Sequence, residues 1–234
     1  MRLLLISNST NPGESYLEYP KEQIRTFLKD TRKVLFIPYA AVSFSFDEYE
    51  RKVQQRFSEM GIEVESIHHS KFPKKSVQDA EAIIVGGGNT FRLLKMIHLF
   101  DLVEAVRFKV LSGTPYIGWS AGANVACPTI CTTNDMPICE PDNFSAFNLV
   151  RFQINPHFID THPEGHAGET REQRILEFLE MDPYVYVVGL RESSMILLEN
   201  VKLTLLGKKP ARIFKKGIPP KEVNPGDDLD FLFE

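Results

Sequence analysis

Short apolar runs alternate with longer amphipathic segments through the first half of the chain. The apolar runs predict strands at residues 3–7, 33–37, 62–67, 82–85 and 116–117. The intervening segments carry apolar residues at helical spacing and predict helices at residues 20–28, 46–60, 90–98 and 101–111. This alternation favours an α/β fold, in which a mostly parallel central sheet has helices on both faces.

The second half of the chain is less regular. Residues 127–168 are rich in Pro, Asn, Asp and Thr and predict loops with short strands. A charged amphipathic helix is expected at 169–181, a strand at 184–188, and a small hairpin across Glu199-Asn200 near the C-terminus. The acidic, proline-bearing segment 219–234 is expected to lie over the surface. With no internal repeat or linker, we expect a single domain over residues 1–234.

Composition excludes several classes of protein. The 234 residues are 43% hydrophobic and 25% charged, which is typical of a globular chain. A net charge of -4 argues against a sequence-independent nucleic-acid surface, and no apolar run approaches the roughly 20 residues of a membrane span. We therefore expect a cytoplasmic protein with neither a nucleic-acid nor a membrane partner. Of the three clustered cysteines, Cys127 is expected to be a small core residue rather than a reactive thiol.

The pentapeptide Gly118-Trp119-Ser120-Ala121-Gly122 follows a predicted strand and precedes a run of small residues. A G-x-S-x-G in this context is typical of a nucleophile elbow, where a sharp turn holds a serine above the sheet. Small flanking residues are needed there because strand and helix approach closely. The alternative is a Gly/Ala-rich turn in which Ser120 only caps a helix.

A second glycine-rich turn, Gly86-Gly87-Gly88-Asn89-Thr90, directly follows the expected central strand. Glycines allow positive φ and a close backbone approach to a ligand. The spacing fits neither common phosphate-binding motif, so an oxyanion-binding turn facing the elbow is favoured over a phosphate loop. A tight strand-to-helix turn without a ligand is the remaining interpretation.

A nucleophilic serine needs a base and an orienting carboxylate. His157 lies in the rigid segment Asn-Pro-His-Phe, whereas His162 and His166 lie in a looser one, and His68, His69 and His98 are interpreted as structural. A metal site built from His157, His162, Glu164 and His166 is conceivable, but its spacing matches no standard ligand pattern. Glu192 follows an apolar strand and is either the orienting carboxylate or a solvated strand-end residue.

Several segments carry a resemblance to a known family. They are Ile83-Ile84-Val85-Gly86-Gly87-Gly88-Asn89-Thr90-Phe91, Tyr116 to Asn124, Thr132-Thr133-Asn134-Asp135-Met136-Pro137-Ile138, Gln153 to Phe158, and Pro163-Glu164-Gly165-His166 with Gly168 to Ile175. In these segments the sequence resembles peptidase E, the α-aspartyl dipeptidase family of serine peptidases. The opening residues 3–12 and Phe36-Ile37-Pro38-Tyr39 also match, so the resemblance spans nearly the whole chain.

The resemblance implies a fold similar to class I glutamine amidotransferases and a catalytic triad of Ser120, His157 and Glu192. Asp135 is the first alternative as orienting carboxylate. The implied activity is removal of an N-terminal aspartate from dipeptides through an acyl-enzyme, with backbone N–H groups of Gly88 and Ala121 as the oxyanion hole. No metal or organic cofactor is implied, and the chain is expected to be a monomer or a homodimer.

Residues expected to bind the small-peptide substrate are Asn89, Asp135, Arg171 and Arg174. Arg171 is the first choice for binding the aspartate side chain, because a guanidinium grips a carboxylate with two hydrogen bonds. Alternatively, Arg171 pairs with Glu169 or Glu172 on a solvated helix face, and Arg174 takes its place.

Two other functions stay open. A relative similar to cyanophycinase, which cleaves an aspartate-arginine polymer, shares the glycine-rich turn and the elbow. A non-catalytic ligand-binding protein with the same fold is the second possibility.

Overall fold

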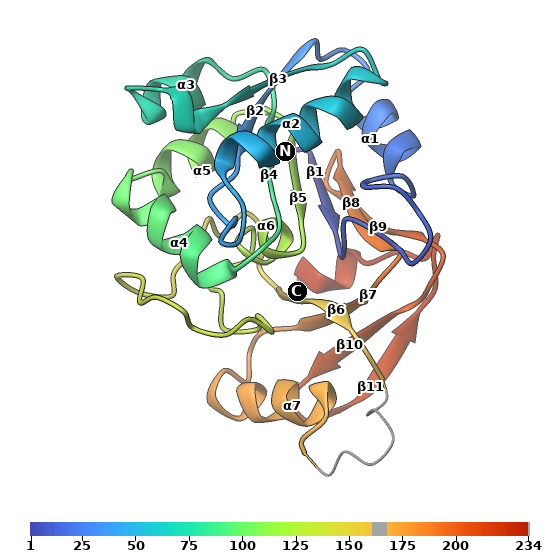
Figure 1. The fold of residues 1–234 in the computed structure, drawn as a ribbon. Coiled ribbons are helices and arrows are strands. Elements are labelled where there is room, and N and C mark those ends of the chain that lie inside the picture. Colours follow the sequence, from blue (N-terminus) through green and yellow to red (C-terminus); the bar gives the residue numbers. More distant parts are fainter. Residues whose placement is uncertain (161–167, 234) are drawn as a thin grey trace.

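A computed structural model describes residues 1–160 and 168–233 of the chain (Figure 1). The strands are β1 (Leu3–Ile6), β2 (Lys33–Ile37), β3 (Glu63–Ser66), β4 (Ile83–Val85), β5 (Tyr116–Trp119), β6 (Gln153–Phe158), β7 (Val187–Arg191), β8 (Ser194–Glu199), β9 (Lys202–Gly207), β10 (Ala211–Lys215) and β11 (Ile218–Val223). The α-helices are α1 (Lys21–Phe27), α2 (Phe46–Ser58), α3 (Pro73–Asp79), α4 (Thr90–Leu99), α5 (Val103–Leu111), α6 (Ala121–Asn124) and α7 (Arg171–Met181). Two short 3-10 helices are η1 (Ile67–His69) and η2 (Asp230–Phe233).

The larger sheet has the strand order β3-β2-β4-β5-β1-β8-β9. The first five of these strands run parallel, and β8 and β9 add an antiparallel hairpin beside β1. The predicted mostly parallel α/β sheet is thereby confirmed. The expected hairpin is present, but its turn is Asn200-Val201, one residue later than predicted, because Glu199 still pairs with Lys202. Parallel strands end at one edge, so the loops after β1, β2, β4 and β5 lie together there.

Alternate residues of the central strands face opposite layers of helices. Leu4 and Ile6 of β1 pack in one buried cluster with apolar residues of α1 and α2. Leu3 and Leu5 pack in another with α3, α4 and α5. Because side chains along a strand alternate in direction, the continuous apolar run of β1 is explained by burial on both faces.

A second sheet, with the order β11-β10-β7-β6, lies beyond the first at the lower side of Figure 1. Helix α7 covers this sheet through a separate cluster that includes Phe158, Ile175 and Phe214. The expected strand at 184–188 begins and ends three residues later, at Val187–Arg191, because it is held between β6 and β10. Its last residue therefore directly precedes Glu192.

The C-terminal segment corrects a prediction. Residues 218–223 form the edge strand β11, most of whose side chains are exposed as expected, whereas Leu229 and Leu232 are buried in the main core. The apolar positions of this segment are isolated among charged residues and prolines, so no periodicity marked them in the sequence.

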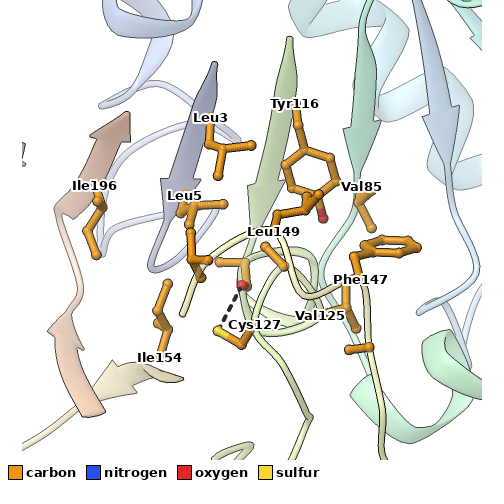
Figure 2. Close-up of a cluster of buried hydrophobic side chains, with 14 of the residues drawn as sticks. Leu3, Leu5, Val85, Tyr116, Val125, Cys127, Phe147, Leu149, Ile154 and Ile196 are labelled. Atoms are coloured by element: carbon orange, nitrogen blue, oxygen red, sulfur yellow. Dashed lines mark hydrogen bonds between the residues drawn. The ribbon is translucent and has the colours of Figure 1, made fainter. Parts of the chain in front are cut away.

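Cys127 lies inside the main core, as expected, among Leu5, Val125, Leu149 and other apolar side chains (Figure 2). The side chain is fully buried, and its Sγ lies 3.8 Å from the carbonyl oxygen of Ala123. Burial raises the pKa of this thiol well above its ordinary value. The thiol at this position is thus an apolar packing group.

Candidate active site

Ser120 occupies a sharp turn between β5 and α6. Its backbone lies at φ 54° and ψ -114°, a conformation that residues with a side chain rarely adopt. The turn is held by the Ser120 N–H, which donates to the carbonyl of Ile6 at 2.9 Å. Only glycine fits at Gly118, where a Cβ would lie 2.1 Å from the carbonyl oxygen of Gly122. These features are those of a nucleophile elbow.

The three residues of the expected triad lie in one line of contacts. Nε2 of His157 lies 3.0 Å from Oγ of Ser120, and Nδ1 of His157 lies 2.7 Å from Oε1 of Glu192. The His157 and Glu192 side chains are 39% and 38% exposed, so a substrate can reach them from solvent. The arrangement allows His157 to accept the serine proton while the carboxylate fixes the ring.

The second sheet supplies both partners of the serine. His157 lies near the end of β6 with a φ of 53°, at the irregularity between Pro156 and Phe158 in the pairing with β7. Glu192 is the first residue after β7. Arg191, immediately before it, turns to other acids, because its Nε donates to Asp160 at 2.7 Å and its Nη1 to Glu222 at 2.7 Å. Glu192 is therefore left to His157.

The loop after β1 supports both partners, a contribution that the sequence analysis did not identify. Oγ of Ser7 accepts a hydrogen bond from the His157 backbone N–H at 2.9 Å. Oδ1 of Asn8 accepts one from the backbone N–H of Ser193, next to Glu192, at 2.9 Å. The sequence signal that could have identified Ser7 and Asn8 is their position as a polar pair directly after a buried parallel strand.

The glycine-rich turn after β4 faces the elbow. A Cβ at Gly87 would lie 2.9 Å from Cβ of Ser120, and Gly88 has a φ of 135° that favours glycine. The hydroxyl of Tyr49 joins the two turns, because it donates to the Gly87 carbonyl at 3.0 Å and accepts from Trp119 Nε1 at 3.1 Å.

Two backbone N–H groups beside Ser120 remain available for a ligand. Within residues 1–160 and 168–233, the N–H groups of Gly88 and Ala121 donate to no backbone or side-chain oxygen. The Ala121 group starts α6, where the first N–H has no partner inside the helix. The two positions expected to form an oxyanion hole thus carry free donors on the two turns that meet at Ser120.

A pocket of about 170 Å³ lies between β6, α7 and the segment 131–136. It is lined by Asn155 of β6, by Arg171, Arg174 and other α7 residues, and by the segment 131–136, which includes Asp135. Asn134 in that segment donates to the Pro156 carbonyl at 2.6 Å, beside His157. The pocket therefore brings both predicted substrate-binding arginines next to the strand that carries the histidine.

The arginines differ in their partners. Arg174 lies 3.7 Å from Glu169, and Glu172 pairs with Arg212 at 2.9 Å. Arg171 forms no ion pair with the residues that the structure describes. Burial lowers the pKa of Arg171 below its usual range, and the nearby Arg174 adds to this effect. Neither carboxylate of the alternative interpretation pairs with Arg171.

Asn89 and Asp135 make structural contacts at the start of α4. Oδ1 of Asn89 caps the helix by accepting from the Arg92 N–H at 3.0 Å, and its Nδ2 donates to the Met136 carbonyl at 2.8 Å. Oδ2 of Asp135 accepts from the backbone N–H of Thr90 at 2.7 Å and from the Thr90 hydroxyl at 2.6 Å. Asp135 thus contacts Thr90, whereas Glu192 contacts His157.

The metal interpretation of the second half concerns four residues, of which the structure describes His157 alone. His157 contacts Ser120 and Glu192, and the other members of that set, His162, Glu164 and His166, lie outside the described residues.

A serine at an elbow, with a histidine and a carboxylate in line, is the arrangement of serine hydrolases. The sequence pattern of Peptidase family S51 matches residues 3–206. A Peptidase E of Nostoc sp. is 50% identical over 234 residues, covering 100% of this chain and 97% of that protein. A Peptidase E of Salmonella paratyphi A is 48% identical over 217 residues, covering 93% of this chain and 95% of that protein.

Two solved structures share the fold. A peptidase from an acI-B1 Actinobacterium superposes with a TM-score of 0.73 at 18% identity, covering 97% of this chain and 96% of the other. A putative Peptidase E of Listeria monocytogenes gives 0.63 at 21% identity, covering 89% and 98%. The chain belongs to Peptidase family S51, and it is accordingly a serine peptidase. Among the described residues, no helix combines the length and apolar character needed to cross a bilayer.

Proposed function

We propose that this peptidase removes an N-terminal aspartate from dipeptides through an acyl-enzyme. In the first step, Oγ of Ser120 attacks the scissile carbonyl carbon while Nε2 of His157, 3.0 Å away, takes the hydroxyl proton. Glu192 accepts the Nδ1–H of His157 and stabilises the imidazolium. The tetrahedral oxyanion is bound by the N–H groups of Gly88 and Ala121.

The intermediate collapses when the C–N bond breaks and His157 gives its proton to the leaving amine. The aspartyl group is then an ester of Ser120. A water molecule, deprotonated by His157, attacks this ester. The second tetrahedral intermediate then collapses, the bond to Oγ of Ser120 breaks, aspartate is released, and His157 returns the proton to Ser120. The same three side chains therefore serve both halves of the cycle.

The observation that carries the substrate assignment is the pair of opposite charges in the pocket beside β6. Arg171 has no partner among the described carboxylates, and Asp135 faces the same pocket. An N-terminal aspartyl residue carries a side-chain carboxylate and an α-ammonium group. We assign the carboxylate to Arg171, with Arg174 as its neighbour, and the ammonium group to Asp135, because each pairing offsets the desolvation of a charge.

The proposal is tested by measuring kcat/KM on Asp-X, Glu-X, Asn-X and β-aspartyl dipeptides with the same second residue. Asp-X should be the best substrate. Arg171→Ala should lower kcat/KM for Asp-X at least about a hundredfold, which corresponds to roughly 2.7 kcal/mol. Its effect on any Asn-X turnover should be much smaller, because the neutral amide does not need the guanidinium. Arg25→Ala, on the exposed surface of α1, is the matched control and should change neither rate.

The chemistry is tested separately from the specificity. A fluorophosphonate should label Ser120, and Ser120→Ala and His157→Ala should each abolish labelling and turnover while leaving the fold intact. Equal losses on Asp-X and Asn-X in Arg171→Ala would contradict its role in specificity and would assign it to the fold or the triad. A preference for β-aspartyl-arginine substrates would favour the cyanophycinase-like alternative, and absence of labelling would favour the ligand-binding one.

A further inference from the structure

A cluster of two histidines and two carboxylates lies outside the triad, beside the edge strand β3. Asp47 and Glu50 lie one turn apart on α2, and His68 and His69 form the end of η1, directly after β3. One ligand atom from each of the four residues lies within 4.8 Å of all the others. From sequence, His68 and His69 are interpreted as structural, because they follow a strand end amid polar residues. The two carboxylates lie about 20 residues earlier in the chain.

The nitrogen and oxygen atoms converge closely. Nε2 of His68 lies 2.9 Å from Oδ1 of Asp47, and Nε2 of His69 lies 2.7 Å from Oε2 of Glu50 and 3.7 Å from Oδ1 of Asp47. The ring centroids of the two histidines are 3.9 Å apart. With neutral imidazoles the cluster carries two negative charges, and four atoms with lone pairs surround one point. A divalent cation would neutralise the charges and be coordinated by the four atoms.

Ser66 orients His68 and Glu50 through hydrogen bonds to atoms other than the proposed ligand atoms. Its Oγ lies 2.6 Å from Nδ1 of His68, and its backbone N–H donates to Oε1 of Glu50 at 3.2 Å. The Ser66 hydroxyl also reaches the carbonyl of Phe36 at 3.5 Å, so it can donate there and accept from the Nδ1–H of His68. That tautomer leaves the lone pair of His68 Nε2 directed at Asp47. Hydrogen bonds of this kind are the usual support behind metal-binding histidines.

Accessibility fits a site that is partly preformed and still open to an entering ion. The side chains of His68 and Glu50 are 13% and 20% exposed, whereas those of His69 and Asp47 are 57% and 62% exposed. The side chains of His68 and Glu50 are thus held by packing, and the more exposed side chains of His69 and Asp47 can adjust around an ion.

We propose that Asp47, Glu50, His68 and His69 bind a divalent transition-metal ion of the zinc class. Two imidazole nitrogens and two carboxylate oxygens make a four-coordinate set suited to Zn²⁺ or Co²⁺, whereas Mg²⁺ and Ca²⁺ prefer all-oxygen sites. The ion links α2 to the segment that leaves β3, and none of its ligands contacts Ser120, His157 or Glu192. Its role is to stabilise the fold, separate from the proposed peptidase chemistry.

The experiment uses the full chain without an affinity tag, freed of metal with a chelator and titrated with Zn²⁺ by calorimetry. One equivalent should bind, and the thermal unfolding midpoint should rise with Zn²⁺ concentration. His69→Asn and Glu50→Gln should each weaken binding at least tenfold. The matched control is His98→Asn, which replaces a histidine on α4 whose ring nitrogen bonds to the carbonyl of Ser145, and it should leave the affinity unchanged.

The free cysteines Cys131 and Cys139 are also accessible and could bind the ion instead. The absorption spectrum of the Co²⁺ form distinguishes thiolate ligands from nitrogen and oxygen ligands. The Co²⁺ form should show ligand-field absorption without a thiolate charge-transfer band, and alkylation of the cysteines should leave the affinity for Zn²⁺ unchanged. The proposal is wrong if His69→Asn and Glu50→Gln bind Zn²⁺ as tightly as the wild type. A thiolate band, or loss of Zn²⁺ binding on alkylation, overturns it as well, since the ion would then lie at the cysteines.

Discussion

Ser7 and His157 are 150 residues apart and joined by one hydrogen bond. The fully buried hydroxyl of Ser7 accepts from the His157 backbone N–H at 2.9 Å and donates to the carbonyl of Leu190 at 2.7 Å. One side chain at the end of β1 thus links the larger sheet to β6 and β7. The base of the proposed triad lies on β6, and its carboxylate directly follows β7.

Ser7→Ala should slow the proposed chemistry without unfolding the protein. The change leaves the partly buried N–H of His157 and the buried carbonyl of Leu190 without their partner, which costs about 1–3 kcal/mol of stability. Because the backbone of His157 is then free to shift, the rate of fluorophosphonate labelling at Ser120 should fall between about tenfold and a hundredfold. Labelling rates and urea unfolding of the same preparations measure the two effects.

Ser194→Ala is the matched control for this prediction. Ser194 is also a fully buried serine with two hydrogen bonds, but both join it to the backbone of Lys209. We expect a similar loss of stability and a much smaller loss of labelling rate. Equal losses of labelling rate in the two variants would mean that Ser7 acts through general stability rather than through His157.

Glu192→Gln should lower kcat at least about a hundredfold, although less than Ser120→Ala, because the amide keeps the ring in place but does not stabilise the imidazolium. Single-turnover measurements and the labelling rate check this. Asp135→Asn provides the comparison, since its carboxylate contacts Thr90. It should slow labelling much less than Glu192→Gln does. The reverse order would transfer the orienting role to Asp135.

Local patterns predicted the parallel half of the fold and the elbow. Buried parallel strands such as Ile83–Val85 are continuous apolar runs. The glycines around Ser120 are required because a Cβ at Gly118 or Gly122 would lie 2.1 Å from a backbone carbonyl oxygen. The second sheet was only partly predictable. Ala211–Lys215 is only five residues long and Ile218–Val223 contains two prolines, and they are strands because β10 pairs with β7 and β11 with β10.

The site shows the same division. Ser120 was predictable from its own segment, whereas the choice of His157 and Glu192 came from the resemblance, because they meet Ser120 only through packing of the two sheets. No local sequence pattern predicts the positive φ of His157 or its hydrogen bond to Ser7. The cluster at His68 and His69 was overlooked for the same reason, since its carboxylates belong to another element.

Cysteine labelling should follow burial. Cys127 is fully buried and its thiol pKa is raised by that burial, whereas Cys131 is exposed. An alkylating reagent should therefore modify Cys131 in the native protein and reach Cys127 only after unfolding, as read by peptide mass spectrometry. Rapid modification of Cys127 in the folded protein, without loss of structure, would contradict its placement in the core.

The last prediction concerns the ion pair behind Glu192. Arg191 donates to Asp160, and this hydrogen bond lowers the pKa of the Asp160 carboxyl below its usual range. A depressed folded-state pKa contributes stability that is complete above the unfolded value of about 3.9 and is lost as the pH falls through the folded value. The Asp160 side chain is 42% exposed, so solvent screening limits the contribution to about 1 kcal/mol or less.

Asp160→Asn should therefore be less stable than the wild type in urea unfolding at pH 7, and the difference should shrink as the pH falls below about 3.9. Glu22→Gln, which removes an exposed helix pair with Arg25, should show a smaller difference at pH 7. A difference between Asp160→Asn and wild type that stays constant down to acid pH would show that Asp160 contributes by packing and not by its charge.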